Sequence, residues 1–267
     1  MSEKLFDFEQ GTIDRYIEGF LGDNKESRIL FLLREPHTYN KNEPKKDQDD
    51  FWFKRILNDK DDHRCKLAFR NGHNLKYFNT YATFASYLLN IPHDQEALSA
   101  IRQCAYMNLF AIRGRQQRST EYKKTKDFLI ALLNGNSIPE NEREGEESIR
   151  AHRVYRLLKY FVNNDTEYIV TVNDLYYDLK QFAIGKEFTW LELPYMKRPK
   201  GSPDKTPRIR HFPGVTVRLF EKDVKLLWFW HPSNPTYQTK LLRGAVPEEY
   251  IIDVPPRAYR PERPTQT

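Results

Sequence analysis

The stretch RILFLLREPHTYN, residues Arg28 to Asn40, decides the class of fold that we expect for this chain. Five apolar residues, Ile29 to Leu33, run directly into the polar sequence Arg34-Glu35-Pro36-His37. A continuous apolar run of this length is typical of a strand that is buried on both faces of a parallel sheet. Open α/β folds bind their ligands at the carboxyl ends of such strands. The polar residues therefore form either a simple turn or a functional loop at the edge of the sheet.

Other segments repeat this pattern and alternate with helical ones. We predict strands at residues 104–112, 167–173 and 225–234, and an extra edge strand at 215–220. Apolar residues at helical spacing predict helices at 5–20, 77–90, 123–133 and 149–161. Strands separated by helices imply right-handed crossovers and helices on both faces of the sheet. The fold class that we expect is α/β: a three-layer α/β/α sandwich with a central, mainly parallel four-stranded sheet.

Length and composition indicate one intracellular domain. The 267 residues are interpreted as a single domain spanning 1–267, with an N-terminal helix at 5–20 and an irregular Pro-rich tail at 254–267. Hydrophobic content of 39% and charged content of 30% are typical of globular proteins. No apolar run approaches the roughly 18–20 residues of a membrane span, and the N-terminus lacks an apolar signal segment. We therefore expect a cytoplasmic protein that has no membrane partner.

The cysteine count limits the possible cofactors. Only Cys65 and Cys104 are present, too few for an iron–sulfur cluster with four cysteine ligands or an all-cysteine zinc site. A disulfide between the two stays open, although a reducing compartment is the simpler setting. His63-Arg64-Cys65 is too short to form a metal site. We expect no metal, no iron–sulfur cluster and no other cofactor.

The net charge of +6 and the isoelectric point of about 9.1 permit binding to nucleic acid. The basic residues are concentrated in two runs, RGRQQRSTEYKK at 113–124 and MKRPKGSPDKTPRIRH at 196–211. Each run is either a solvated surface loop or a segment that contacts phosphate.

Polar residues occupy the ends of three predicted strands. Glu35-Pro36-His37 follows the first, Asn108 lies within the second, and His231-Pro232-Ser233-Asn234 closes the last. A Glu-Pro or His-Pro pair is ordinarily a turn, whereas an Asn within a buried strand must find partners for its amide. Because all carboxyl ends of a parallel sheet lie on one edge, the three segments are expected to converge on one crevice.

Together these segments resemble the uracil-DNA glycosylase superfamily, with this chain as a divergent member. LREPHT at 33–38 stands where the family has a Gly-Gln-Asp-Pro-Tyr-His type loop, and IRQCAYMNLFAIRG at 101–114 resembles the segment with the base-reading Asn. WFWHPSNP at 228–235 matches the final His-Pro-Ser motif. The resemblance covers residues 29–239 discontinuously. The chain departs from the family's Gly, Gln, Asp and Tyr at four positions, which here are Leu33, Arg34, Glu35 and His37.

The resemblance implies an enzyme that flips a base out of DNA and hydrolyses its N-glycosidic bond, the base being uracil or another modified base. It assigns Glu35 to orienting water and stabilising an oxocarbenium-like sugar. His231 would stabilise the anion left on the base. Asn108 would read the edge of the base, while Pro36 fixes the loop and His37 screens the C5 substituent of the base.

The implied partner is DNA, single- or double-stranded. Its backbone would contact Ser233, Asn234, Arg113 and Arg115. An aromatic residue must stack on the base, and the sequence does not choose among Phe51, Trp52 and Phe69.

Two alternatives to this function stay open. One is a catalytically weak nucleic-acid- or nucleotide-binding relative of the same fold, because the first motif is altered. The other is an unrelated α/β hydrolase, although no Gly-rich phosphate loop, G-x-S-x-G or H-E-x-x-H motif supports it.

Overall fold

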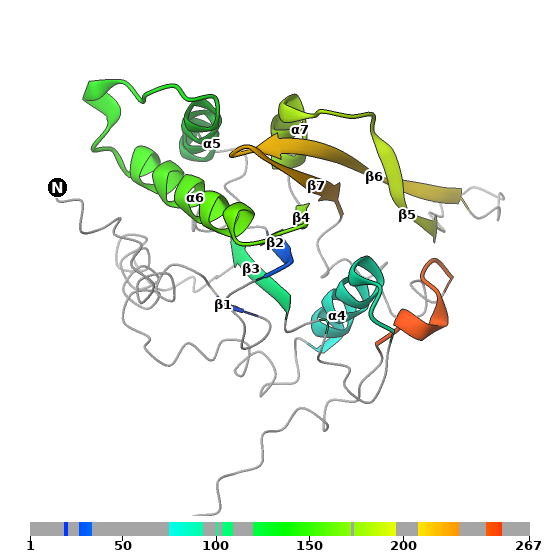
Figure 1. Ribbon diagram of the computed structural model, residues 1–267. Coiled ribbons are helices and arrows are strands. Elements are labelled where there is room, and N and C mark those ends of the chain that lie inside the picture. The colour runs from blue at the N-terminus through cyan, green and yellow to red at the C-terminus, as the bar shows by residue number, and fades with distance from the viewer. Residues whose placement is uncertain are drawn as a thin grey trace, which may run out of the picture.

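A computed structural model describes nine parts of the chain: residues 19–20, 27–33, 75–92, 100, 103–108, 120–171, 174–195, 208–229 and 244–252. Their fold is mixed α/β, with helices on both faces of one sheet (Figure 1). The α/β class that we predicted is confirmed. Within these parts of the chain, no helix is both long and apolar enough to cross a membrane.

The sheet has seven strands in the order β1-β3-β2-β4-β7-β6-β5. Their bounds are Gly19–Phe20 (β1), Ile29–Leu33 (β2), Cys104–Asn108 (β3), Tyr168–Thr171 (β4), Phe188–Tyr195 (β5), Arg208–Leu219 (β6) and Lys222–Trp228 (β7). The four central strands, β3, β2, β4 and β7, are parallel to one another. The outer strands β1, β6 and β5 are each antiparallel to their inner neighbour. The four-stranded sheet that we expected is therefore the parallel centre of a larger, mixed sheet.

The apolar run of β2 supplies side chains to both faces of the sheet. Leu30 and Leu32 belong to one hydrophobic cluster, whereas Ile29 and Phe31 belong to another. All four are buried. Because successive side chains of a strand point to opposite faces, such a run is stable only where both faces are covered.

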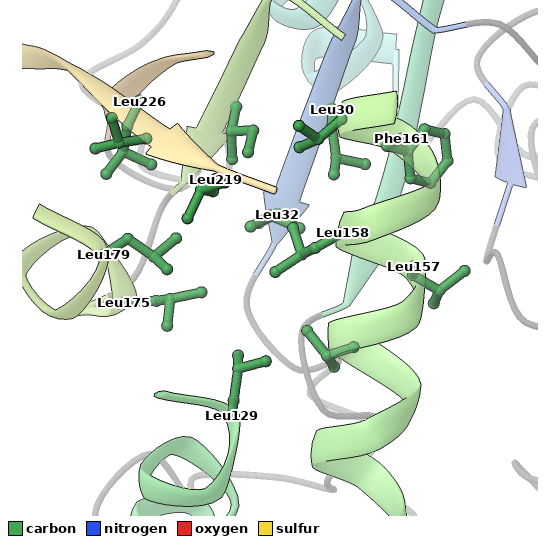
Figure 2. Close-up of a cluster of buried hydrophobic side chains, with 14 of the residues drawn as sticks. Leu30, Leu32, Leu129, Leu157, Leu158, Phe161, Leu175, Leu179, Leu219 and Leu226 are labelled. Carbon is green, nitrogen blue, oxygen red and sulfur yellow. The ribbon is translucent and has the colours of Figure 1, made fainter. Parts of the chain in front are cut away.

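Helices cover the two faces unequally. The helices α5 (Thr120–Leu133), α6 (Glu146–Asn163) and α7 (Leu175–Leu179) pack on the face that carries Leu30. Figure 2 shows leucines of β2 and of these three helices pointing into the space between the sheet and the helices. On the opposite face, α4 (Leu75–Leu89) packs together with residues 245–252. The Ile252 N–H donates to Thr83 Oγ1 of α4 at 3.0 Å, which ties this late segment to the core.

Predicted helices agree with the structure to within three residues for α4, α5 and α6, because each presents one broad apolar face. Residues 19–20 differ: we predicted the end of a helix, but they form β1 and pair with Ala105 and Tyr106 of β3. Sheet pairing here overrides a local helical pattern. The rest of the predicted helix 5–20 and the tail 254–267 lie outside the described residues.

Strand β5 and the first half of β6 were not predicted. Pro194 and Pro213 interrupt their apolar patterns, and Pro normally argues against a strand interior. Pro194 lies in the edge strand β5, and Pro213 pairs with Thr189, where the register of β5 shifts. Edge strands and such irregularities are the places in a sheet where a missing backbone donor is tolerated. The short helix α7 was also missed, because five residues are too few for a helical period to be recognised.

Candidate functional site

The carboxyl ends of the four parallel strands lie in one row across the sheet. Met107 of β3 pairs with Leu32 of β2, Leu32 pairs with Thr171 of β4, and Thr171 pairs with Trp228 of β7. All four strands run in the same direction through this row. The chain therefore leaves the parallel sheet at one common edge, where α/β folds place their ligands.

Asn108 is the last residue of β3, and it pairs with Leu33 at the end of β2. Neighbouring strands are about 4.8 Å apart. Glu35 follows Leu33 by two positions in the sequence. The backbone of Asn108 thus lies beside the point from which the Glu35-Pro36-His37 segment departs.

Most residues singled out in the sequence lie outside the described part of the chain. These are Glu35, Pro36, His37, Arg113, Arg115, His231, Ser233 and Asn234, together with the alternative stacking residues Phe51, Trp52 and Phe69. Asn108 is described by its place in β3. His231 follows Phe229, the last described residue of its segment, by two positions.

Aromatic side chains hold the end of β7 in place. The Trp190 Nε1–H donates to the Trp228 carbonyl oxygen at 3.0 Å. The ring of Trp228 stacks on Phe212, with centroids 5.8 Å apart and an interplanar angle of 24°. The next residue, Phe229, packs edge-on against Phe84 of α4 at 4.3 Å. The chain that leads toward His231 therefore departs from a rigid base, because large buried rings leave little room for movement.

A cation lies over this aromatic cluster. The guanidinium carbon of Arg210 is 5.5 Å from the centroid of the Trp228 ring, and Arg210 is exposed to solvent. This is the geometry of a cation–π contact. Sequence reasoning noted the basic run that contains Arg210 but missed its aromatic partner, 18 residues further along the chain.

A polar cluster holds the segment that follows β4. Asp174, three residues beyond Thr171, accepts a hydrogen bond from Tyr122 Oη at 3.1 Å. It also accepts one from Lys126 Nζ at 3.3 Å, and Lys126 forms an ion pair with Asp178 at 2.9 Å. These contacts join α5 to the start of α7 beside the candidate edge. Sequence reasoning missed all four residues, since no motif marks them.

The electrostatics of Lys126 follow from this cluster. Burial by itself lowers the pKa of Lys126, because it penalises the charged form. The hydrogen bonds and charges of Asp178 and Asp174 outweigh burial, so the pKa of Lys126 is raised above its usual value. Lys126 is thus a fixed positive charge near the carboxyl edge.

Two further observations concern cofactor chemistry. Among the described residues, no group of three or more His, Cys, Asp or Glu side chains is arranged to hold a metal ion. Cys104 is a free, buried thiol that donates to the Ala100 carbonyl oxygen at 3.4 Å. Burial raises the pKa of Cys104, which keeps it protonated and unreactive.

The chain was also compared with known proteins. No protein-family model, no curated protein and no solved structure matches it.

Proposed function

We propose that this chain is a uracil-DNA glycosylase-like enzyme, which hydrolyses the N-glycosidic bond of uracil or another modified base in DNA. The observation that carries the proposal is the row of strand ends Leu32, Thr171 and Trp228, with Asn108 beside Leu33. The motifs LREPHT and WFWHPSNP begin at Leu33 and Trp228, within one residue of this row, and Asn108 of the remaining motif follows Met107 of the row. The finer fold that belongs to the proposal is a glycosylase-type α/β/α sandwich around the parallel strands β3, β2, β4 and β7.

Chain position supports a division of labour between two of the motifs. Glu35 and His231 each lie three residues beyond the row, after Leu32 and after Trp228. The strands that carry them, β2 and β7, are separated only by β4, so their ends are roughly 10 Å apart.

Each proposed residue then has a chemical task. Asn108 reads the pairing edge of the flipped base with its amide donor and acceptor. His231 stabilises the negative charge that develops on the base as the glycosidic bond breaks. Glu35 orients the attacking water and stabilises the cationic sugar. Pro36 and His37 shape the base pocket, while Ser233, Asn234, Arg113 and Arg115 contact the DNA backbone.

The altered first motif favours a second candidate function, a nucleic-acid-binding relative with little or no catalysis. Glu35 is one methylene longer than the Asp of the resembled motif, and a displacement of about 1 Å can cost roughly 100-fold in rate. Leu33 replaces a glycine, which removes a position of close backbone approach.

One assay separates the two functions. The purified full chain is incubated with single-stranded and duplex oligonucleotides that each contain one uracil, and with an undamaged control. Release of free base is measured together with binding, by fluorescence anisotropy. We expect release of uracil only from the uracil-containing strands. Binding without release of any modified base would favour the second function, and absence of both would overturn the two together.

A further inference from the structure

The strand order of the parallel sheet contains a switch point between β2 and β4. From β2 the chain passes to β3 on one side, and from β3 it crosses to β4 on the other side of β2. The first described helix after β2, α4, packs on one face of the sheet, whereas α7, which follows β4, packs on the opposite face (Figure 1). Open α/β sheets bind their ligands at the carboxyl ends of the strands that flank such a switch point. The neighbouring ends of β2 and β4 are therefore where a ligand is expected.

Asp174 follows β4 at this switch point. It lies three residues beyond Thr171 of the row, just as Glu35 lies three residues beyond Leu32, the partner of Thr171. Covalent geometry keeps the Cα of Asp174 within about 11 Å of the Thr171 Cα. The chain thus carries one carboxylate after each of the two strands that flank the switch point.

Two donors from α5 hold the carboxylate of Asp174 in place. Tyr122 Oη donates to Oδ1 at 3.1 Å, and Lys126 Nζ donates to Oδ2 at 3.3 Å. Tyr122 is only 1% exposed, and the side chain of Lys126 is 17% exposed, whereas that of Asp174 is 48% exposed. A carboxylate has about four acceptor positions. Asp174 is therefore fixed by two well-packed donors and still presents acceptor positions to solvent, as a preorganised site residue does.

A purely structural role explains Asp174 less well. An Asp that precedes a helix ordinarily caps it, but the side chain of Asp174 makes no cap hydrogen bond to α7. Lys126 also pairs with Asp178 at 2.9 Å, and this contact ties α5 to α7 without Asp174. One lysine and two aspartates give this group of three charges a net charge of −1. Neither capping nor the tie between the helices requires the second carboxylate.

We propose that Asp174 is a further catalytic residue, a second carboxylate that orients the attacking water together with Glu35 and accepts its proton. The inference rests on the proposed function, because it assigns a residue to the same reaction. The water oxygen bonds to the sugar C1′ as the C1′–N bond breaks, and the electron pair of that bond moves to the base. The proton lost by the water passes to Asp174 and then to solvent, while the anionic base takes up a proton from solvent.

Two carboxylates suit this chemistry. Hydrolysis of glycosidic bonds commonly uses a pair of Asp or Glu residues around an oxocarbenium-like sugar. In this chain the first motif has Glu35 where the resembled motif has Asp. A rigidly held carboxylate from the neighbouring strand would compensate for a displacement of the Glu35 carboxylate, because catalysis depends on exact placement of the reacting groups.

The test compares the two aspartates that share Lys126. Asp178 pairs with the same lysine, but it lies four residues further along the chain. Asp174→Asn and Asp178→Asn thus remove the same charge from the same cluster, and Asp174→Glu keeps the charge but moves the carboxylate by one methylene. Single-turnover release of uracil from a single-stranded oligonucleotide is measured on the full chain, together with oligonucleotide affinity by fluorescence anisotropy. Circular dichroism and urea denaturation check folding.

We expect Asp174→Asn and Asp174→Glu each to lower the rate of uracil release by roughly tenfold or more. The affinity of Asp174→Asn for the oligonucleotide should be unchanged or tighter, since a negative charge near phosphates is removed. Asp178→Asn should release uracil within about twofold of the wild-type rate. Asp174→Glu can keep the ion pair with Lys126, so it decides the question if Asp174→Asn does not fold.

Three results would separate this inference from the proposed function. In a wild type that releases base, a wild-type rate in folded Asp174→Asn or Asp174→Glu would overturn the inference alone. Equal losses of rate in Asp174→Asn and Asp178→Asn would do the same, because they would assign Asp174 to the structural tie. A wild type that releases no base from any modified oligonucleotide would overturn both the inference and the proposed function.

Discussion

Leu33 of β2 lies directly opposite Asn108 of β3 in the parallel sheet, at the carboxyl ends of both strands. The two residues are 75 positions apart in the chain. Their pairing brings Leu33, which precedes the Glu35-Pro36-His37 segment by one residue, beside Asn108. Asn108 carries the amide side chain of the strand Cys104–Asn108. The first two predictions test whether this juxtaposition is catalytic.

Asn108→Ala and His231→Ala should each reduce uracil release from a single-stranded oligonucleotide by at least roughly tenfold. Each removes an interaction that reads the base or strengthens as negative charge develops on it. Single-turnover release of labelled base is the measurement. Asn136→Ala is the control, because Asn136 is exposed just beyond α5 and should behave as the wild type. Equal rates for Asn108→Ala and Asn136→Ala would remove Asn108 from the site.

Glu35→Gln should abolish turnover and leave oligonucleotide affinity unchanged or tighter. The substitution removes the carboxylate that supports a cationic sugar, and it also removes a negative charge near phosphates. Release and anisotropy are measured on the same preparation. If Glu35 is only a turn residue, the activity of Glu35→Gln should stay within about twofold of the wild type. Its free energy of unfolding should then differ from that of the wild type by no more than roughly 0.5 kcal/mol.

Glu35→Asp shortens the side chain by one methylene and keeps its negative charge, so it tests the effect of side-chain length alone. We expect a loss of activity if the pocket is built around glutamate. A gain in uracil release would instead mean that the longer side chain weakens an otherwise competent site, since about 1 Å of displacement can cost roughly 100-fold.

Gly214→Ala should destabilise the fold by about 1–3 kcal/mol, the usual cost of overpacking. An added Cβ would lie 2.7 Å from Leu227 Cδ2 and 2.8 Å from the ring of Phe188, both of them on neighbouring strands. Gly185→Ala is the matched control, because nothing lies within 4 Å of its added Cβ. Urea denaturation should show Gly185→Ala within about 0.5 kcal/mol of the wild type. A neutral Gly214→Ala would contradict the packing of β5 and β7 against β6.

Lys126→Met should lower the free energy of unfolding, and the size of this loss should depend on pH. The pKa of Lys126 is raised above 10.5 in the folded chain, so its stabilising contribution is complete below about pH 10 and is lost as pH rises through the raised pKa. The difference in unfolding free energy between wild type and variant should be about 1 kcal/mol at pH 8 and smaller near pH 11. Lys159→Met, at an exposed position of α6, should show little difference at either pH. A pH-independent loss in Lys126→Met would indicate packing rather than charge.

Some elements were predictable because local chemistry alone requires them. Ile29–Leu33 contains only apolar residues, and such a run is stable only when both of its faces are covered. The helices α4, α5 and α6 carry broad apolar faces at helical spacing, so their existence and approximate bounds could be read from the chain. Asn108 was recognisable as the polar residue that breaks an apolar strand, although the sequence placed it within that strand and the structure ends β3 at it.

Other features depend on partners that are distant in sequence. The outer strand β5 contains Pro194 and an exposed glutamate, and it is a strand because β6 pairs with it. The bond between Tyr122 and Asp174 joins residues 52 positions apart, and the Trp190–Trp228 bond joins residues 38 apart. No local pattern encodes such contacts.

The sequence by itself therefore determined the α/β class, the buried strand Ile29–Leu33 and the polar residues at the ends of the strands, because burial and periodicity act over a few neighbouring residues. Only the tertiary structure decided the strand order, the row through Leu32, Thr171 and Trp228, and the position of Arg210 over Trp228. These depend on which strand pairs with which and in what register. That choice is made by the summed packing of both faces of the sheet and not by any single segment.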